Sequence, residues 1–397
     1  MITRTVVFPI HPTESQKEAL EKTVELYTKA FKECIDIAWD MEKLSANQVH
    51  KETYKKLREK LGLKSQYVCS ARNRAVETVK AMRALKKRGK KISKPVQDNP
   101  VIKPIPIRLD VRTLSFDKPR EIASVATQKG RIKIPIFWHK QAMRYKEWGC
   151  KAGEVGVDKN GKWVIRLIFE KKPEKYKRTG NVIGADRGIR HAVVSSNFVG
   201  RSSTGAKTDN KFFGKGEWRE YERRLLLLRS RLQSKGTTSA KGHLKRLSGR
   251  LRRFRENCDR IVAKDFFSDI FPGDTVVLEN LTNIRERCGK KGQVHKKHRK
   301  KMGRWSFKRL ENAINYIAQL KGVYVEYIKP HYTSQMCSNC NVIIKSNRKS
   351  QSFYSCSCGL KLNADLNASR NIANIWRMAN GYMSGLTVNQ PIVTNCL

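Results

Sequence analysis

The chain has 397 residues, and its 83 Lys and Arg residues against 35 Asp and Glu residues leave a formal net charge of +48. Such a charge repels itself in the folded state unless a polyanion neutralises it, so nucleic acid is the expected partner. A hydrophobic content of 39% excludes a disordered tail protein, and no long apolar run predicts a membrane span. Two or three domains are expected at this length. The first residues lack a signal-peptide layout, which predicts a cytoplasmic protein. In a prokaryote it would be associated with the nucleoid when bound to DNA.

The N-terminal half is predicted to combine a small β-barrel with inserted helices. Residues 3–10 alternate as a short strand, and Thr13 with Gln16 forms a capping box for the helix that follows. A second helical region is expected from Lys51 to Leu85. Residues 100–170 hold three β-like runs separated by glycine and asparagine turns. We therefore expect residues 1–10 and 96–180 to form the barrel and residues 11–95 to form the helical insert.

The C-terminal half alternates apolar strands with basic helices. Residues 182–196 are expected to form two strands around a tight turn, with Asp186 near the end of the first. A strongly basic pair of helices follows over 216–263. Residues 274–281 predict another buried strand, with Glu279 near its end. A helix and a strand are expected between residues 305 and 330, and a last helix carries Asp365. Three acids thus stand on three separate elements.

Those three acids are candidate ligands of divalent cations. Mg²⁺ prefers oxygen ligands, and two ions held about 3.5 to 4 Å apart activate water against a phosphodiester. In so basic a chain, a cluster of acids suits nucleic acid only if cations bridge it to phosphate. Each acid alone also has a plainer interpretation. Asp186 could be a turn residue, Glu279 an arginine partner, and Asp365 a helix N-cap.

Three segments carry a resemblance to a known family. The segments "IGADRGIRHAVVSS", "VVLENL" and "CGLKLNADLNASRNI" resemble, in this order, the three split motifs of a RuvC-like nuclease. With the basic helices after the first motif and a cysteine-rich segment before the third, the chain resembles the TnpB family of transposon-encoded RNA-guided DNA endonucleases. Compact type V CRISPR effectors share this arrangement. The resemblance covers most of the chain and is specific from Val182 to Ile375.

The resemblance implies an α+β multidomain fold. Residues 181–329 and 360–378 would form an RNase H-like (RuvC) α/β nuclease domain, with a zinc ribbon inserted at 330–359. The barrel would be a wedge domain and the helices a recognition insert, whereas the uncharged tail 379–397 stays unassigned. Asp186, Glu279 and Asp365 would be the catalytic ligands of two Mg²⁺ ions, with Mn²⁺ as an alternative. The family's Asp-Arg-Asp style motif is replaced here by Asn363-Ala364-Asp365, which keeps the aligned acid.

Four cysteines form two close pairs, Cys337 with Cys340 and Cys356 with Cys358, fifteen residues apart. Paired cysteines at such spacing predict a structural zinc site, since zinc takes four thiolate or imidazole ligands. The second pair is one residue shorter than the family's usual spacing, so His331 is considered as a substitute ligand. A vestigial ribbon of reduced cysteines is the alternative. The segment between the pairs is expected to form a short hairpin, and the ribbon would brace the segment that carries Asp365.

Basic residues are expected to contact nucleic acid, and the resemblance implies guide RNA and target DNA as partners. The guide could come from a transposon end or a CRISPR array. A transposase or recombinase acting without RNA, and an RNA-guided repressor that does not cleave, are the rivals. No membrane partner is expected, and a monomer is favoured. The candidate nucleic-acid contacts are Arg72, Arg74, Lys86, Lys87, Arg88, Arg223, Arg224, Arg252, Arg253, Lys296, Lys297 and Arg299.

Overall fold

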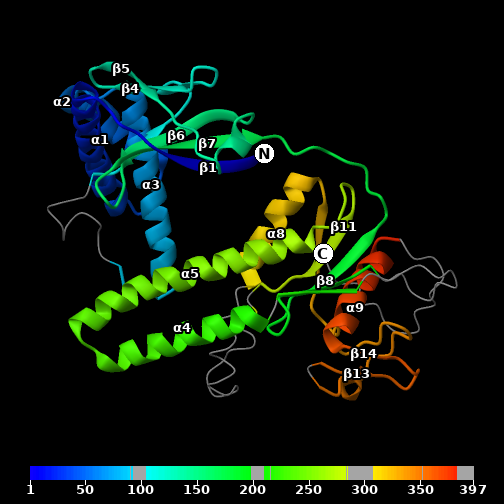
Figure 1. Ribbon diagram of the computed structural model, residues 1–397. Helices are drawn as coiled ribbons and strands as arrows, with labels where there is room; N and C mark the ends of the chain where they lie inside the picture. The colour runs from blue at the N-terminus through cyan, green and yellow to red at the C-terminus, as the bar shows by residue number, and fades with distance from the viewer. Residues whose placement is uncertain are drawn as a thin grey trace. The chain divides into compact units, whose positions relative to one another are not determined.

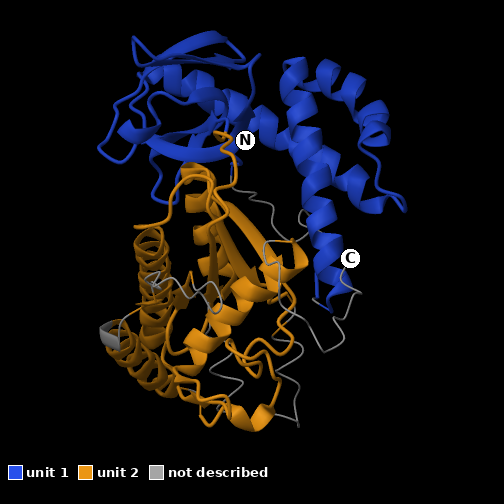
Figure 2. Cartoon of the chain, turned by 90° about the vertical axis from the view of Figure 1, so that its right-hand side faces the viewer, with its two compact units in different colours: residues 1–172 blue, residues 173–397 orange. Residues whose placement is uncertain are grey.

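The chain folds into two compact units, residues 1–172 and 173–397, which Figure 2 shows in different colours. The computed structural model describes residues 1–89, 91–92, 104–197, 210–214, 216–282, 284, 307–350 and 352–381. The predicted contacts Lys296, Lys297 and Arg299, and the tail beyond residue 381, lie outside the described residues. None of the helices within the described ranges is long and apolar enough to cross a membrane.

Unit 1 contains two antiparallel sheets. The four-stranded sheet has the order β1-β7-β6-β2 and is built from β1 (Ile2–Pro9), β7 (Trp163–Lys171), β6 (Gly149–Val157) and β2 (Ile107–Leu109). The second has the order β3-β4-β5, from β3 (Leu114–Asp117), β4 (Ile122–Thr127) and β5 (Gly130–Pro135). The predicted strand content of this half is confirmed. The short helix η1 (Met143–Tyr145) precedes β6.

Three helices, α1 (Glu14–Asp40), α2 (Ala46–Leu61) and α3 (Ser65–Lys87), complete unit 1. The capping box of Thr13 and Gln16 is present at the start of α1. The helical region expected over 51–85 is present, but it is divided into two helices. Gly62 ends α2 in the left-handed conformation (φ 60°), which a residue without Cβ adopts at little cost, and α3 starts three residues later.

Unit 2 is built on a five-stranded sheet of order β10-β9-β8-β11-β12. Figure 1 labels its strands β8 and β11. Its strands are β8 (Val182–Asp186), β9 (Val193–Ser196), β10 (Asn210–Phe213), β11 (Thr275–Glu279) and β12 (Tyr324–Ile328). β8, β11 and β12 are mutually parallel, whereas β9 and β10 pair antiparallel. A mixed sheet with helices is what the RNase H-like prediction requires, although the mixture alone does not single out that fold.

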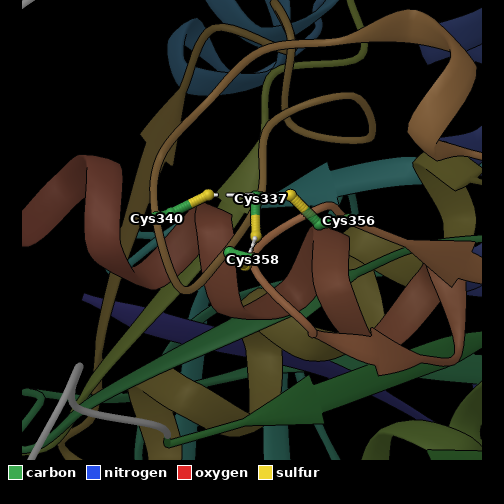
Figure 3. Close-up of side chains that lie close together, drawn as sticks. All are labelled: Cys337, Cys340, Cys356 and Cys358. Carbon is green, nitrogen blue, oxygen red and sulfur yellow. Dashed lines mark hydrogen bonds between the residues drawn. The ribbon is translucent and has the colours of Figure 1, made fainter.

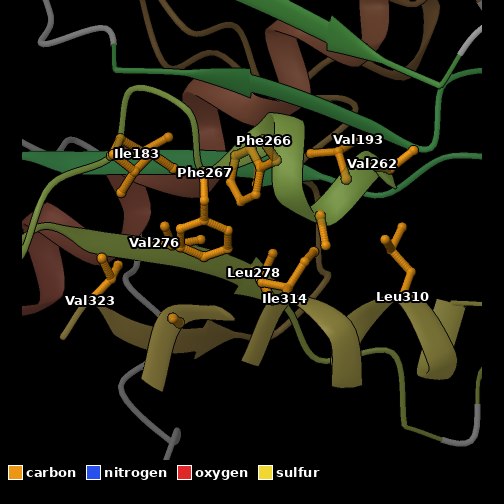
Figure 4. Close-up of a cluster of buried hydrophobic side chains, with 14 residues drawn as sticks. Ile183, Val193, Val262, Phe266, Phe267, Val276, Leu278, Leu310, Ile314 and Val323 are labelled. Carbon is orange, nitrogen blue, oxygen red and sulfur yellow. The ribbon is translucent and has the colours of Figure 1, made fainter. Parts of the chain in front are cut away.

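Helices cover both faces of this sheet. On one face, alternate residues such as Ile183 and Leu278 pack with residues of α5 (Thr238–Phe266) and α8 (Phe307–Lys321) (Figure 4). On the other face, Val182 and Val277 pack with α9 (Ala364–Ala379). Because successive side chains of a strand point to opposite faces, the strands are buried on both sides and read as continuous apolar runs.

The predicted basic helix pair is confirmed as α4 (Gly216–Lys235) and α5, joined by a short turn. Leu225 of α4 packs with Leu247 and Leu251 of α5 in a small apolar cluster. This seam is narrow, so most of the charged side chains on the pair remain in solvent.

Residues 330–363 contain little regular structure: η2 (Lys345–Asn347), β13 (Tyr354–Ser355) and β14 (Lys361–Leu362). A hairpin was expected between the two cysteine pairs. Instead, the paired strands β13 and β14 flank the second cysteine pair, and single bridges tie Met336 to Ile343 and Arg348 to Tyr354. With so few ladder hydrogen bonds, this segment depends on its cysteines and on its contacts with α9.

The boundary between the units lies eight residues before the expected end of the barrel at residue 180. Residues 176–179 are held on unit 2. The Arg178 guanidinium lies 4.2 Å from the centre of the Tyr324 ring and pairs with Glu326, and Thr179 donates to Asp274. These contacts explain why the connecting segment belongs with the second unit.

Candidate nuclease site and zinc centre

Asp186 and Glu279 end two neighbouring parallel strands. The register pairs Thr275 with Val182 and Leu278 with Ala185, so one further step places Glu279 beside Asp186. Neighbouring strands lie about 4.8 Å apart. By alternation, both acids belong to the face of the sheet that α9 covers, since Val182 and Val277 face α9. Two carboxylates therefore meet at the carboxyl edge of the sheet.

Helix α9 brings the third acid to the same edge. At its C-terminal end, Arg377 donates to the Val182 carbonyl oxygen over 2.7 Å, and Ser369 lies against Gly184. The helix therefore runs antiparallel to β8. Asp365 precedes Ser369 by four residues, about 6 Å along a helix, and Asp186 follows Gly184 by two residues, about 6.6 Å along a strand. Asp365 and Asp186 consequently lie at about the same position along the strand direction.

Asn363, and not Asp365, is the N-cap of α9. The Asn363 Oδ1 atom accepts hydrogen bonds from the backbone N–H of Asp365 at 2.9 Å and of Leu366 at 3.3 Å. The N-cap interpretation of Asp365 was therefore wrong. Asp365 lies in the first turn and its side chain is 9% exposed, so the carboxylate has no capping role and is held at the helix end.

The three carboxyl groups are electrostatically coupled. Burial, followed by the negative charges of Glu279 and Asp365, raises the pKa of Asp186 well above its usual value. Burial also raises the pKa of Glu279 and that of Asp365. Arg348 lowers all three pKa values and Arg187 lowers those of Asp186 and Glu279, but neither outweighs burial at these acids, and divalent cations would supply further positive charge.

The three carboxylates do not form a compact cluster around a single point. Within the described ranges, the four cysteines are the one group in which three or more possible ligand atoms all lie within 4.8 Å of one another. The oxygen atoms of the three carboxylates are therefore farther apart than that in at least one pair. Two cations about 4 Å apart, each with oxygen ligands at about 2.1 Å, can be shared by carboxylates whose oxygens are up to about 8 Å apart. The donor set, all oxygen and all carboxylate, fits Mg²⁺ or Mn²⁺.

Two residues that the sequence did not reveal contact the acids. The Thr333 hydroxyl donates to Glu279 Oε1 over 2.6 Å, and an Arg348 nitrogen lies 3.4 Å from Asp365 Oδ1. Both come from the segment before α9. The arginine partner foreseen for Glu279 is only partly present, because Arg187 binds the backbone oxygen of Glu279 and forms its ion pair with Glu311.

The four predicted cysteines form one cluster (Figure 3). The Sγ atoms of Cys337 and Cys358 lie 3.6 Å apart, as do those of Cys340 and Cys356. Four sulfurs at about 2.3 Å from one tetrahedral ion would lie about 3.8 Å from each other, so the cluster has the geometry of a zinc site. His331 is not part of this cluster, and the shortened second pair closes it without a substitute ligand.

The cysteine segment is fastened to α9 by two buried asparagines. Asn367 donates to the Met336 carbonyl oxygen over 2.7 Å and accepts from the Ser338 backbone N–H. Asn371 donates to the carbonyl oxygens of Thr333 and Met336. The cluster and the helix that carries Asp365 are therefore one packed body.

Two family models match parts of the chain. The model described as "Cas12f1-like, TNB domain" matches residues 307–372, which include α8, the four cysteines and Asp365. The model described as "Uncharacterized protein MJ0013 family" matches residues 23–114 in unit 1.

Two curated relatives share long segments with the chain. It is 29% identical over 232 residues to the CRISPR-associated endodeoxyribonuclease Cas12f1 of Sulfoacidibacillus thermotolerans, over 54% of this chain and 51% of the relative. It is 32% identical over 131 residues to the TnpB-like protein MJ0751 of Methanocaldococcus jannaschii, over 32% of this chain and 45% of the relative. Over these segments the chain is homologous to TnpB-like proteins and compact type V effectors. It spans about half the length of these two relatives.

Solved structures extend the similarity of fold to most of the chain. The structure of a Cas12f1-sgRNA-target DNA complex superposes with a TM-score of 0.58 at 15% identity, over 90% of this chain and 82% of that one. The mini-RNA-guided endonuclease CRISPR-Cas_phi3 superposes with a TM-score of 0.55 at 11% identity, over 94% and 92%. At these identities the likeness concerns the fold.

The predicted nucleic-acid contacts differ in how exposed they are and in which residues they bind. Arg74 is partly buried and donates to the Pro106 carbonyl oxygen over 2.7 Å and to Glu154, so it is engaged within unit 1. Arg223 and Arg224 are exposed but both bind Glu220. The other predicted contacts in the described residues lie at the end of α3 or on α5, apart from Arg72 within α3. Those that are exposed are Lys86, Lys87, Arg88, Arg252 and Arg253.

Proposed function

We propose that the chain is an RNA-guided DNA endonuclease that hydrolyses phosphodiester bonds with divalent cations. The observation that carries this proposal is the meeting of three carboxylates from β8, β11 and α9 at one edge of the unit 2 sheet. Relatives named as endodeoxyribonucleases, and fold neighbours solved with guide RNA and target DNA, support the substrate class.

The residues of this site would have different roles in binding and positioning the cations. Asp186, Glu279 and Asp365 would hold two Mg²⁺ ions, or Mn²⁺. Such ions, when bound, activate a water and stabilise the leaving oxygen of a phosphodiester. Thr333 orients the Glu279 carboxylate by donating to one of its oxygens, which leaves the other oxygen free. Asn363 holds the first turn of α9, and with it Asp365.

The cysteine cluster would hold a structural Zn²⁺ ion. Two observations support zinc at this cluster: the two Sγ–Sγ separations of 3.6 Å and the burial of Cys337 and Cys356. All four positions around such an ion would be filled by thiolates, which is typical of structural rather than catalytic zinc. Since Asn367 and Asn371 tie this segment to α9, the ion would stabilise the position of Asp365.

Sequence recognition would be shared between RNA and protein. In this scheme a guide RNA pairs with the target strand, and the protein reads a short target-adjacent motif and holds the heteroduplex through its backbone. The exposed basic residues of α3 and α5 suit phosphate contacts. The net charge of +48 supports a polyanionic partner bound over a large surface.

The test separates cutting from guided binding. The Asp186→Ala variant, purified with its RNA, should bind a matched target as the wild type does but should not cut it. Mismatched target is the control for guidance. Equal cutting by wild type and variant would remove the catalytic assignment. Cutting that survives complete removal of RNA would instead favour a transposase or recombinase, and sequencing the copurifying RNA would show the origin of the guide.

A further inference from the structure

Arg187 is a buried arginine that joins the ends of both acid-bearing strands. Its side chain is fully buried, and its Nη1 atom lies 2.8 Å from Glu311 Oε2 on α8. The same nitrogen lies 3.4 Å from the Phe307 carbonyl oxygen, and Nη2 donates to the backbone carbonyl oxygen of Glu279. One guanidinium therefore connects β8, β11 and the first turns of α8.

The guanidinium replaces a hydrogen bond that the sheet cannot make. Beyond Asp186 the chain leaves the sheet, because the Gly188 backbone N–H turns to the His191 carbonyl oxygen. The β8–β11 ladder consequently stops beside the two acids, and the Glu279 carbonyl oxygen takes its donor from the Arg187 side chain. This hydrogen bond therefore joins the two strand ends beside the acids.

The charges around Arg187 also favour this role. Asp186 and Glu279 are like charges on adjacent strands, and their repulsion acts to separate the strand ends. The Arg187 guanidinium is bound to the Glu279 backbone, and its positive charge acts on both acids. Glu311 is 8% exposed and binds Arg187 and, over 2.6 Å, Lys308, so the buried guanidinium is both paired and oriented.

We infer that the Arg187–Glu311 pair is a positioning device that sets the separation of the Asp186 and Glu279 carboxylates and thereby the affinity of the site for divalent cations. This inference rests on the proposed function, because it requires the two acids to be cation ligands. Arg187 would contact neither the cations nor the DNA. It acts through the backbone of Glu279, and residues that orient metal ligands typically contribute about 10- to 100-fold to metal affinity.

The test compares cation binding in the wild type and five variants of the full chain, each purified with its RNA. Mn²⁺ binding is titrated by the loss of its free electron paramagnetic resonance signal, and Asp186→Asn gives the background from RNA and other sites. Arg187→Gln and Glu311→Gln should raise the dissociation constant of the Asp186-dependent Mn²⁺ by about 10- to 100-fold. The Mn²⁺ concentration for half-maximal cutting should rise in parallel, while cutting at saturating Mn²⁺ changes only a few-fold.

Arg309→Gln is the matched control. Arg309 also lies on α8 and pairs with a buried acid, Asp259 of α5, but it contacts neither Glu279 nor Asp186. It should lower the melting temperature and leave Mn²⁺ affinity unchanged. If Arg187→Gln does not fold, Arg187→Lys and Glu311→Gln carry the test. A lysine keeps the charge but cannot bind both partners in this geometry, so an intermediate affinity is expected.

The outcomes separate the inference from the proposed function. Wild-type Mn²⁺ affinity in folded Arg187→Lys and Glu311→Gln would overturn the inference and leave the cation site in place. Equal Mn²⁺ binding by the wild type and Asp186→Asn would show that the three acids are not a cation site, and the proposed function would fail with it.

Discussion

Gly184 of β8 and Ser369 of α9 are in backbone contact. A Cβ atom placed on Gly184 would lie 1.9 Å from the Ser369 carbonyl oxygen and 2.8 Å from the Ala373 backbone nitrogen. Both atoms belong to the helix backbone, which cannot move aside as the end of a side chain can. Only glycine permits this approach, and the approach determines how deeply α9 lies on the sheet beside Asp186.

Gly184→Ala should therefore push α9 away from β8. We expect the free energy of unfolding to fall by about 3 kcal/mol, the upper range for overpacking, and DNA cutting to be lost because Asp365 moves with the helix. Gly242→Ala is the control. Gly242 lies in α5 with open space at its Cβ position, so alanine should stabilise by about 0.5 to 1 kcal/mol and leave cutting unchanged. Wild-type cutting by Gly184→Ala would contradict the close packing of α9.

The metal-free protein should be more stable without one of its acids. Burial and the charges of Glu279 and Asp365 raise the pKa of Asp186 in the folded state. A carboxyl with a raised folded-state pKa favours folding while it is protonated, so its contribution is lost as the pH rises through that pKa. In EDTA at pH 8, Asp186→Asn should melt about 2 to 4 °C above the wild type, which corresponds to about 1 kcal/mol in a unit of this size.

The pH profile provides the control for that comparison. At pH 5 the two proteins should differ less, since more of the wild-type carboxyl is protonated there. Mg²⁺ should raise the melting temperature of the wild type more than that of Asp186→Asn. A difference that shrinks as the pH rises would show that the carboxyl is stabilised as an anion, contrary to its environment.

Loss of one cysteine ligand should release zinc and weaken cutting. Cys340→Ser removes one of four thiolates, so zinc per chain should fall from about one to near zero by elemental analysis. Because Asn367 and Asn371 attach the ribbon to α9, cutting should fall by at least about tenfold. Cys69→Ser, a single cysteine of unit 1 outside the cluster, should keep both zinc and activity. Full cutting by zinc-free Cys340→Ser would show that the ribbon does not position Asp365.

The strands that carry the acids were predictable because their local signals agree. Residues 182–186 and 275–279 are short apolar runs that end in a carboxylate, and such runs are typical of strands buried on both faces. The helix start at Thr13 was predictable for the same reason, since both partners of the capping box lie within four residues. Each of these features depends on neighbours in sequence.

The contacts that complete the site depend on residues far apart in sequence. Thr333 is 54 residues from its partner Glu279, and Arg187 is 124 residues from Glu311. Nothing in the sequence distinguishes Arg187 from the 83 basic residues of the chain, most of which belong at the surface. The division of residues 46–87 into two helices, by contrast, had a local signal in Gly62.

Exposed arginines and arginines bound within the protein should differ in their effect on the salt dependence of nucleic-acid binding. Arg252 and Arg253 are exposed on α5, and each phosphate contact that is lost should reduce the slope of log affinity against log salt by about 0.9. The double change to glutamine should thus lower the slope by up to about 1.8. Arg74→Gln should instead lower the melting temperature, because Arg74 is bound to Pro106 and Glu154, and should leave the slope unchanged.

Removal of the α9 N-cap should weaken cutting without removing any acid. Asn363→Ala deprives the Asp365 and Leu366 backbone N–H groups of their acceptor, which costs about 1 kcal/mol of helix stability and loosens the turn that carries Asp365. We expect cutting to fall by about fivefold, the rate factor equivalent to that energy. Asn363→Ser keeps a capping oxygen and should restore most of the activity, as measured by single-turnover cutting of a matched target. Equal activity of the alanine and serine variants, at either level, would mean that the cap does not control the position of Asp365.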